Sequence, residues 1–329
     1  VSLVPICSGD SYPNTVNPLK IDKFSLGRVA MFSNIEEYRR AIVLSQIRNK
    51  TREAWNHWAP MIRDKLGALP NSRQIVSLAN DLRDIFKSSG KSGRDQSELS
   101  SSGANWENFI IWYLNLLSVG TNVIVTKPVN EFRPAVLSDV LTVSFSNNRT
   151  NSEADLIAFS IPDLENLNKS GFKINSLVGH VRRNITDVSL SVLQCKTNWN
   201  DNAQAPMLWG LIYEGASQGQ RIHNTLRVGT GGVNLQNLAN FSYGFATVPS
   251  NDPQKINSKS LQVLRVASLS AGNFWGMAHK PGVASPLSEF LPLNFPSMYD
   301  KGMEQSLNEW LDAKRTAVDY FFKLDQMNP

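Results

Sequence analysis

Two short stretches of the chain carry side chains that could perform chemistry together. Glu153 and Asp155 come directly before an apolar run at 156–159, and Gln194 and Lys196 end a second apolar run. Side chains alternate along a β-strand, so each of these two pairs shares one face of its strand. If the two strands pair, a carboxylate, an amide oxygen and an ammonium group meet at one edge of a sheet.

This set of groups is the minimum needed for metal-assisted hydrolysis of a phosphodiester. Carboxylate and carbonyl oxygens are the hard ligands that Mg²⁺ prefers. An ammonium group can position the attacking water and offset the charge that develops on the phosphorane. Glu153 and Asp155 are rival metal ligands on the residues alone, because both point the same way.

Asp155 followed by Gln194-Cys195-Lys196 resembles the Asp…(Asp/Glu)-x-Lys motif of the PD-(D/E)XK nucleases. That superfamily includes most type II restriction endonucleases. The chain departs from the motif by carrying Gln at the second acidic position, as Mrr-like restriction enzymes do, and Ala before Asp155. The resemblance covers roughly residues 104–270, and the order of a helix, several strands and a second helix agrees with it.

The resemblance implies a fold, a cofactor and a set of site residues. The expected fold is α/β, with a restriction-endonuclease-like mixed sheet flanked by helices. Asp155, Gln194 and the backbone carbonyl of Cys195 would bind Mg²⁺, and Lys196 would orient the water. Glu107, in the helix before the sheet, would be a further catalytic and metal-binding residue. The implied protein is a homodimeric, sequence-specific endonuclease of double-stranded DNA that needs no nucleotide cofactor.

Two other functions remain open at this point. The first is a modification-dependent nuclease of the Mrr-like kind or a junction resolvase, which would read methyl groups or shape. The second is a non-catalytic DNA-binding protein in which Gln194 and Lys196 merely end a strand.

Composition limits the class of protein. With 41% hydrophobic and 19% charged residues among 329, the chain is an ordinary globular protein. Its net charge of +5 is compatible with a nucleic-acid partner. Two cysteines, Cys7 and Cys195, exclude a disulfide framework. No apolar window of about 18 residues predicts a membrane span, and residues 1–10 do not resemble a signal peptide. We therefore expect a cytoplasmic protein.

The pattern of residues predicts three parts. Residues 1–90 form a helical N-terminal region for DNA embrace, recognition or dimerisation. Residues 91–103, rich in Ser and Gly, form a linker or loop. Residues 104–329 form the nuclease core, which ends in a long amphipathic helix at 298–327. A basic cluster in the N-terminal region suits either phosphate contacts or a solvated face; its members are Arg39, Arg40, Arg48, Lys50 and Arg52.

Individual elements follow from hydrophobic periodicity. The predicted helices are 34–47, 51–67, 71–86 (with Asn71 as N-cap), 105–117, 203–216 and 298–327. The predicted strands are 122–125, 141–145, 155–159, 188–196, 241–247 and 261–266.

Overall fold

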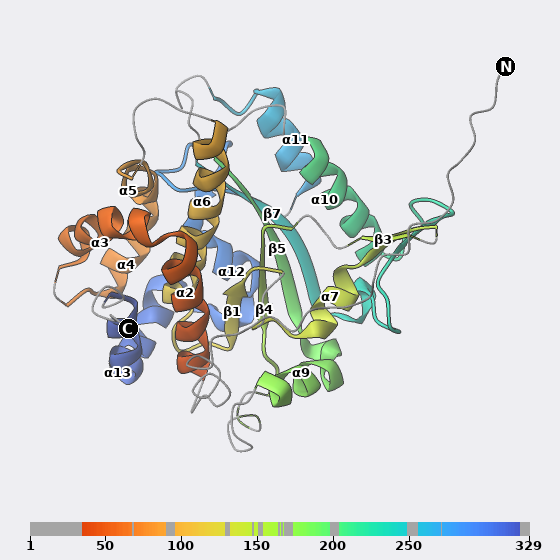
Figure 1. The fold of residues 1–329 in the computed structure, drawn as a ribbon, viewed down its shortest axis with the longest axis horizontal. Coiled ribbons are helices and arrows are strands. Elements are labelled where there is room, and N and C mark those ends of the chain that lie inside the picture. Colours follow the sequence, from red (N-terminus) through yellow and green to blue (C-terminus); the bar gives the residue numbers. More distant parts are fainter. Residues whose placement is uncertain are drawn as a thin grey trace. The chain divides into compact units, whose positions relative to one another are not determined.

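A six-stranded mixed sheet lies at the centre of the computed structural model (Figure 1). The structure describes residues 35–67, 69–89, 96–128, 132–146, 148–150, 154–163, 165, 167, 174–197, 204–248, 256–270 and 272–322. In order across the sheet the strands are β1 (Val123–Thr126), β4 (Leu156–Ser160), β5 (Ser189–Lys196), β7 (Asn240–Thr247), β8 (Asn273–Trp275) and β9 (Ser285–Pro286).

The direction of the strands changes in the middle of this sheet. The pairs β1–β4 and β4–β5 are antiparallel, whereas the pairs β5–β7, β7–β8 and β8–β9 are parallel. A second, antiparallel sheet is small. In spatial order it contains β3 (Asn148–Thr150), β2 (Val143–Phe145) and β6 (Leu226–Val228).

Helices surround the sheet and connect its strands. The α-helices are α2 (Ile35–Lys50), α3 (Arg52–Leu66), α4 (Ser72–Ser77), α5 (Leu82–Lys87), α6 (Gln96–Leu117), α7 (Ala135–Leu141), α9 (Ile174–Arg183), α10 (Gln204–Ser217), α11 (Leu261–Leu269), α12 (Phe290–Asn294) and α13 (Met303–Phe322). Short 3₁₀-helices are η1 (Leu78–Asn80), η2 (Ile185–Asp187), η4 (Leu235–Asn237), η6 (Leu287–Glu289) and η7 (Pro296–Met298).

The predicted α/β class, with a mixed sheet preceded by helices, is confirmed. The sheet strands are strongly buried, as their apolar sequences require: β1 and β4 are buried along their whole length. Asn71 caps α4 as predicted, and its side chain accepts a hydrogen bond from the backbone of Gln74. The prediction of a C-terminal helix is also confirmed, although α13 begins at Met303 and η7 precedes it.

The predicted linker at 91–103 is wrong at 96–103, and its residues 91–95 lie outside the described residues. α6 begins at Gln96, so residues 96–103 form its first turns. The Ser and Gly content of this segment is typical of a loop. The segment is helical because the aromatic and aliphatic residues from Trp106 onward are buried and stabilise the helix, which continues toward its N-terminus from them. Helix α6 packs against both α2 and the sheet.

The strand predicted at 261–266 is also wrong, because these residues begin helix α11. Val263 and Val266 are each 2% exposed, whereas Leu261 and Leu264 are largely exposed. Burial every third residue is the helical period, and it places the two valines on the packed face. The sequence 261–266 carries apolar residues on both faces, so alternation alone could not separate the two structures.

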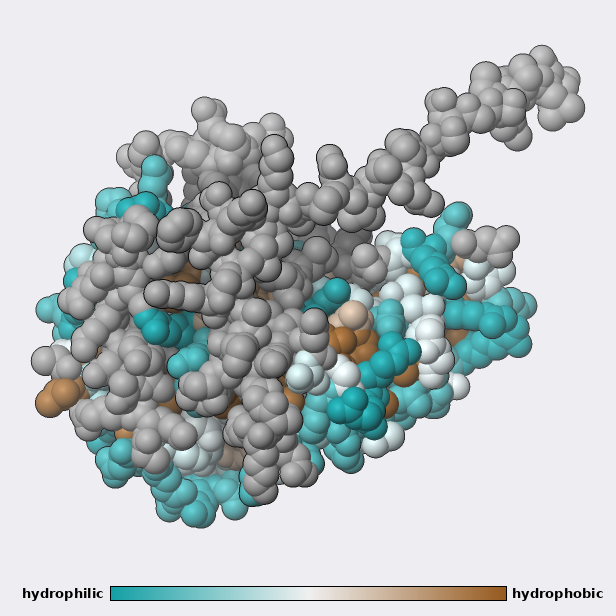
Figure 2. Space-filling model, turned by 60° about the horizontal axis from the view of Figure 1, so that its bottom comes forward, coloured by the Kyte–Doolittle hydropathy of each residue, from teal (hydrophilic) through white to brown (hydrophobic). Residues whose placement is uncertain are grey.

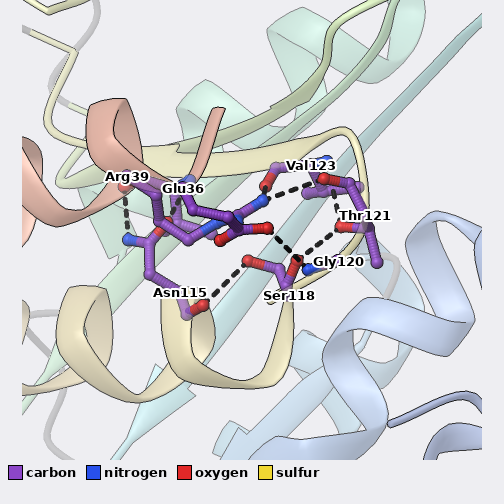
Figure 3. A network of polar contacts seen from close by, with 8 residues as sticks. Glu36, Arg39, Asn115, Ser118, Gly120, Thr121 and Val123 are labelled. Atoms are coloured by element: carbon purple, nitrogen blue, oxygen red, sulfur yellow. Dashed lines mark hydrogen bonds and ion pairs between the residues drawn. The ribbon is translucent and has the colours of Figure 1, made fainter. Parts of the chain in front are cut away.

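A buried ion pair joins α2 to the turn between α6 and β1 (Figure 3). The Arg39 guanidinium contacts the Glu36 carboxylate and donates to the carbonyls of Thr121 and Val123 at 3.0 and 2.9 Å. The second carboxylate oxygen of Glu36 accepts the Gly120 N–H at 2.8 Å. These bonds satisfy carbonyl groups where the chain turns into the sheet, which is a structural role.

The basic cluster predicted in this region is therefore not a single phosphate-binding face. Arg39 is fully buried and engaged in the network just described, while Arg52 is exposed. The side chains of Arg48 and Lys50 lie outside the described residues.

On the face in Figure 2, hydrophilic side chains predominate among the described residues, and apolar ones show only in patches between them. None of the helices in the described ranges has the length and apolar character needed to cross a bilayer.

Candidate active site

The start of β4 and the end of β5 meet at one edge of the central sheet, because the two strands are antiparallel. Their register pairs Leu156 with Leu193. One residue further toward the edge, this register sets Asp155 opposite Gln194, and opposite residues project from the same face. Lys196, two residues beyond Gln194, shares that face. The structure therefore brings together the three residues that the sequence singled out.

Asp155 is held by two donors from β5. Its Oδ2 atom accepts the backbone N–H of Cys195 at 2.7 Å and the side-chain Nε2 of Gln194. Both bonds fall on the same oxygen, which fixes the carboxylate plane and leaves Oδ1 as the oxygen that can receive a further ligand. The carboxylate is thus oriented by the strand next to it.

The environment of Asp155 raises its pKa. Burial, which penalises the charged carboxylate, is the largest cause and raises the pKa to about 6. The charge of Lys196 and the bond from Cys195 act in the opposite direction, as does the charge of Lys127, whereas the negative charge of Glu107 raises the pKa further. A buried carboxylate whose pKa is this high gains from an additional positive charge close by.

Gln194 is 3% exposed and both ends of its amide are engaged. Its Nε2 faces Asp155, and its Oε1 accepts the hydroxyl hydrogen of Tyr243, on β7, at 3.2 Å. Tyr243 is itself buried against Tyr213 of α10, with ring centroids 6.1 Å apart. In this orientation the amide nitrogen faces Asp155, so metal binding by Gln194 Oε1 would require the amide to turn over.

The backbone of Cys195 is directed toward Asp155. The carbonyl of the next residue, Lys196, accepts the Val248 N–H at 2.9 Å on the β7 side. Successive residues of a strand direct their backbone groups to opposite sides, so Cys195 directs both N–H and carbonyl to the β4 side. Its N–H reaches Asp155, and its carbonyl faces the same region. Burial raises the pKa of the Cys195 thiol, so the thiol stays protonated.

Glu107 reaches the site from helix α6. The neighbouring Trp106 is fully buried and donates its indole N–H to the carbonyl of Ala246 at 3.2 Å, which fixes the helix against the end of β7. Gly276 permits this close approach, since a Cβ there would lie 2.2 Å from the Trp106 ring. The Glu107 carboxylate accepts a hydrogen bond from Lys127 Nζ at 2.7 Å.

Lys127 is a site residue that the sequence did not reveal. It follows β1, whose last residue, Thr126, pairs with Ile157 of β4, so it lies at the same edge as Asp155. The side chains of Lys127 and Glu107 are 20% and 21% exposed, which makes theirs a partly dehydrated ion pair. A single lysine after a four-residue strand has no sequence signature, and only the fold places it near Glu107.

These residues fit one Mg²⁺ ion with few protein ligands. Asp155 Oδ1 and the Cys195 carbonyl are oxygen donors of the kind that Mg²⁺ uses, and Mg²⁺ keeps several of its waters. In the described ranges, no group of three or more His, Cys, Asp or Glu side chains could hold a metal ion. Glu153, the rival of Asp155, lies outside these ranges.

No protein-family model matches the chain, and no curated protein matches it.

Proposed function

We propose that the chain is a Mg²⁺-dependent, sequence-specific endonuclease of double-stranded DNA, of the PD-(D/E)XK type. The observation that carries this proposal is the meeting of Asp155, Gln194 and Lys196 at one sheet edge, with a carboxylate whose pKa is raised by burial. The order α6, β1, β4, β5, α10, β7 also supports a restriction-endonuclease-like core. A homodimer in the cytoplasm is part of the proposal, because a double-strand cut needs two such sites.

The chemistry would be hydrolysis of a phosphodiester. When bound, Mg²⁺ supplies a Lewis acid for the scissile phosphate. Asp155 Oδ1 and the Cys195 carbonyl would hold it, and Gln194 keeps the Asp155 carboxylate in place. The oxygen of a water molecule would form the new bond to phosphorus while the bond to the leaving oxygen breaks; the proton of the water would pass to solvent, and the leaving oxygen would take one from solvent. The Lys196 ammonium would orient this water and offset the extra negative charge on the phosphorane. Glu107 and Lys127 complete the charged edge of the site.

Incubation of the purified chain with unmethylated phage DNA tests the proposed function. We expect discrete fragments with Mg²⁺ and none with EDTA, and the mapped ends would give the recognition sequence. Cleavage restricted to methylated DNA would favour the modification-dependent alternative. DNA binding without cleavage in Mg²⁺ or Mn²⁺ would favour the non-catalytic one, in which the bond between Gln194 and Asp155 simply closes a strand end.

Replacing Tyr243 by phenylalanine should both destabilise the fold and disturb the site. The Gln194 Oε1 atom would lose its donor while remaining buried, which costs about 1–3 kcal/mol. Urea denaturation measures this loss. The orientation of the Gln194 amide would no longer be fixed, so we also expect more Mg²⁺ to be needed for half-maximal cleavage.

Tyr113→Phe is the matched control for this change. The Tyr113 hydroxyl is equally buried but donates to the carbonyls of Ile75 and Val76, away from the sheet edge. It should lose comparable stability with an unchanged Mg²⁺ requirement. An equal shift of the Mg²⁺ requirement in both variants would contradict the role of Tyr243 at the site.

A further inference from the structure

The ion pair between Glu107 and Lys127 limits the number of metal ions that the site can bind. Two carboxylates lie at this edge, because Glu107 pairs with Lys127, which follows β1 at the same edge of the sheet as Asp155. Phosphodiester-cleaving sites with two carboxylates commonly bind two divalent ions a few ångströms apart. In this chain, however, the second carboxylate already has a cation of its own.

Contact and burial make Lys127 a strong partner for Glu107. Its Nζ lies 2.7 Å from Glu107 Oε2, and about four-fifths of each side chain is shielded from solvent. A charged hydrogen bond in such a setting is shorter and stronger than an exposed one. A divalent ion at Glu107 would have to displace the ammonium group or lie beside it against strong repulsion.

The formal charges around Asp155 point the same way. The edge carries two carboxylates, Asp155 and Glu107, and two ammonium groups, Lys127 and Lys196, and the charges of Glu107 and of both lysines act on Asp155. The carboxylates are thus balanced by the chain itself, and one divalent ion gives the edge the positive excess that an anionic phosphate requires. The described ranges also contain no group of three or more His, Cys, Asp or Glu side chains that could hold a second ion.

We propose that Lys127 takes the place of a second metal ion at Glu107, so that the site binds a single divalent cation next to Asp155. This inference rests on the proposed nuclease function and specifies its metal requirement. Lys127 is thereby a positioning residue: it holds Glu107 in place and keeps it from acting as a metal ligand. The expectation from sequence that Glu107 binds metal would hold only in a chain without this lysine.

Counting bound Mn²⁺ by electron paramagnetic resonance, without DNA, tests the inference independently of cleavage. We expect one Mn²⁺ per chain for the wild type, two for Lys127→Met, and one again when Glu107→Gln is added to that variant. Lys127→Arg keeps the positive charge and should bind one. Lys65→Met is the control, because Lys65 pairs with Asp81 in an exposed ion pair away from this edge, and it should also bind one.

The outcomes separate the two proposals. Two Mn²⁺ ions in the wild type, or a single ion in a folded Lys127→Met variant, would overturn the inference and leave the nuclease function standing. No bound Mn²⁺ in the wild type, together with no cleavage of DNA, would overturn both. Circular dichroism of each variant shows whether the fold is retained, and Lys127→Gln, which also removes the positive charge and should bind two, provides the count if Lys127→Met does not fold.

Discussion

Replacing Lys196 by methionine is expected to slow DNA cleavage by about a hundred- to a thousandfold while leaving DNA binding nearly unchanged. The Lys196 ammonium shares a face with Gln194 and acts on the buried Asp155 carboxylate. Removing one donor that acts where charge develops in the transition state has an effect of this size. Binding depends on many phosphate contacts, so a single lysine contributes little to it.

Single-turnover cleavage, with protein in excess over DNA, measures the chemical step for this variant, and filter binding in EDTA measures affinity. Lys259→Met is the matched control, because Lys259 is an exposed lysine in the turn before α11. It should leave both quantities unchanged. A Lys196→Met protein that cleaves at the wild-type rate would remove Lys196 from the mechanism.

The central part of the candidate site could be predicted from the sequence because it depends on local order. Asp155 stands directly before one apolar run, and Gln194 and Lys196 end another. Once these runs pair as antiparallel strands, the start of one and the end of the other must meet. Strand alternation then fixes which side chains share a face. No other knowledge of the fold is needed for this step.

Residues that reach the site from other elements could not be predicted in the same way. Tyr243 lies on the parallel neighbour of β5, and its bond to Gln194 depends on the register of two strands 49 residues apart. Lys127 meets Glu107 only because α6 packs across the sheet and β1 ends at the same edge. Neither residue type has a spacing that marks it, so tertiary packing alone selects them.

The errors in the predicted elements have a related cause. Residues 96–103 have a loop-like composition, yet they continue a helix that is anchored by the buried Trp106. The run 261–266 is apolar on both faces, so its period is ambiguous. In both places the secondary structure is decided by what the segment packs against, and local propensity carries no information about that packing.

The raised pKa of Asp155 links the site to the stability of the whole fold. Its ordinary value is 3.8, and in the folded protein it is about 6, mainly because of burial. Between these two pH values the folded state binds more protons than the unfolded state, so the free energy of unfolding falls as pH rises. The difference between the two pKa values lowers the free energy of unfolding by at most about 3 kcal/mol, and this loss is fully present above pH 6. The ionised carboxylate is therefore kept at the expense of stability.

Asp155→Asn is accordingly expected to abolish cleavage and to stabilise the fold in EDTA by up to about 3 kcal/mol at pH 8, with no gain near pH 4. The amide oxygen of asparagine can still accept the bonds from Cys195 and Gln194, so the gain reflects the loss of the buried charge. Urea denaturation of both proteins across this pH range measures the difference in stability. Asp300→Asn is the control, because Asp300 is an exposed carboxylate.

Mg²⁺ at pH 8 should raise the melting temperature of the wild type and leave that of Asp155→Asn unchanged. A stability difference that does not vary with pH would show that Asp155 is not the group with the raised pKa, whereas equal stabilisation of both proteins by Mg²⁺ would place the cation elsewhere in the chain.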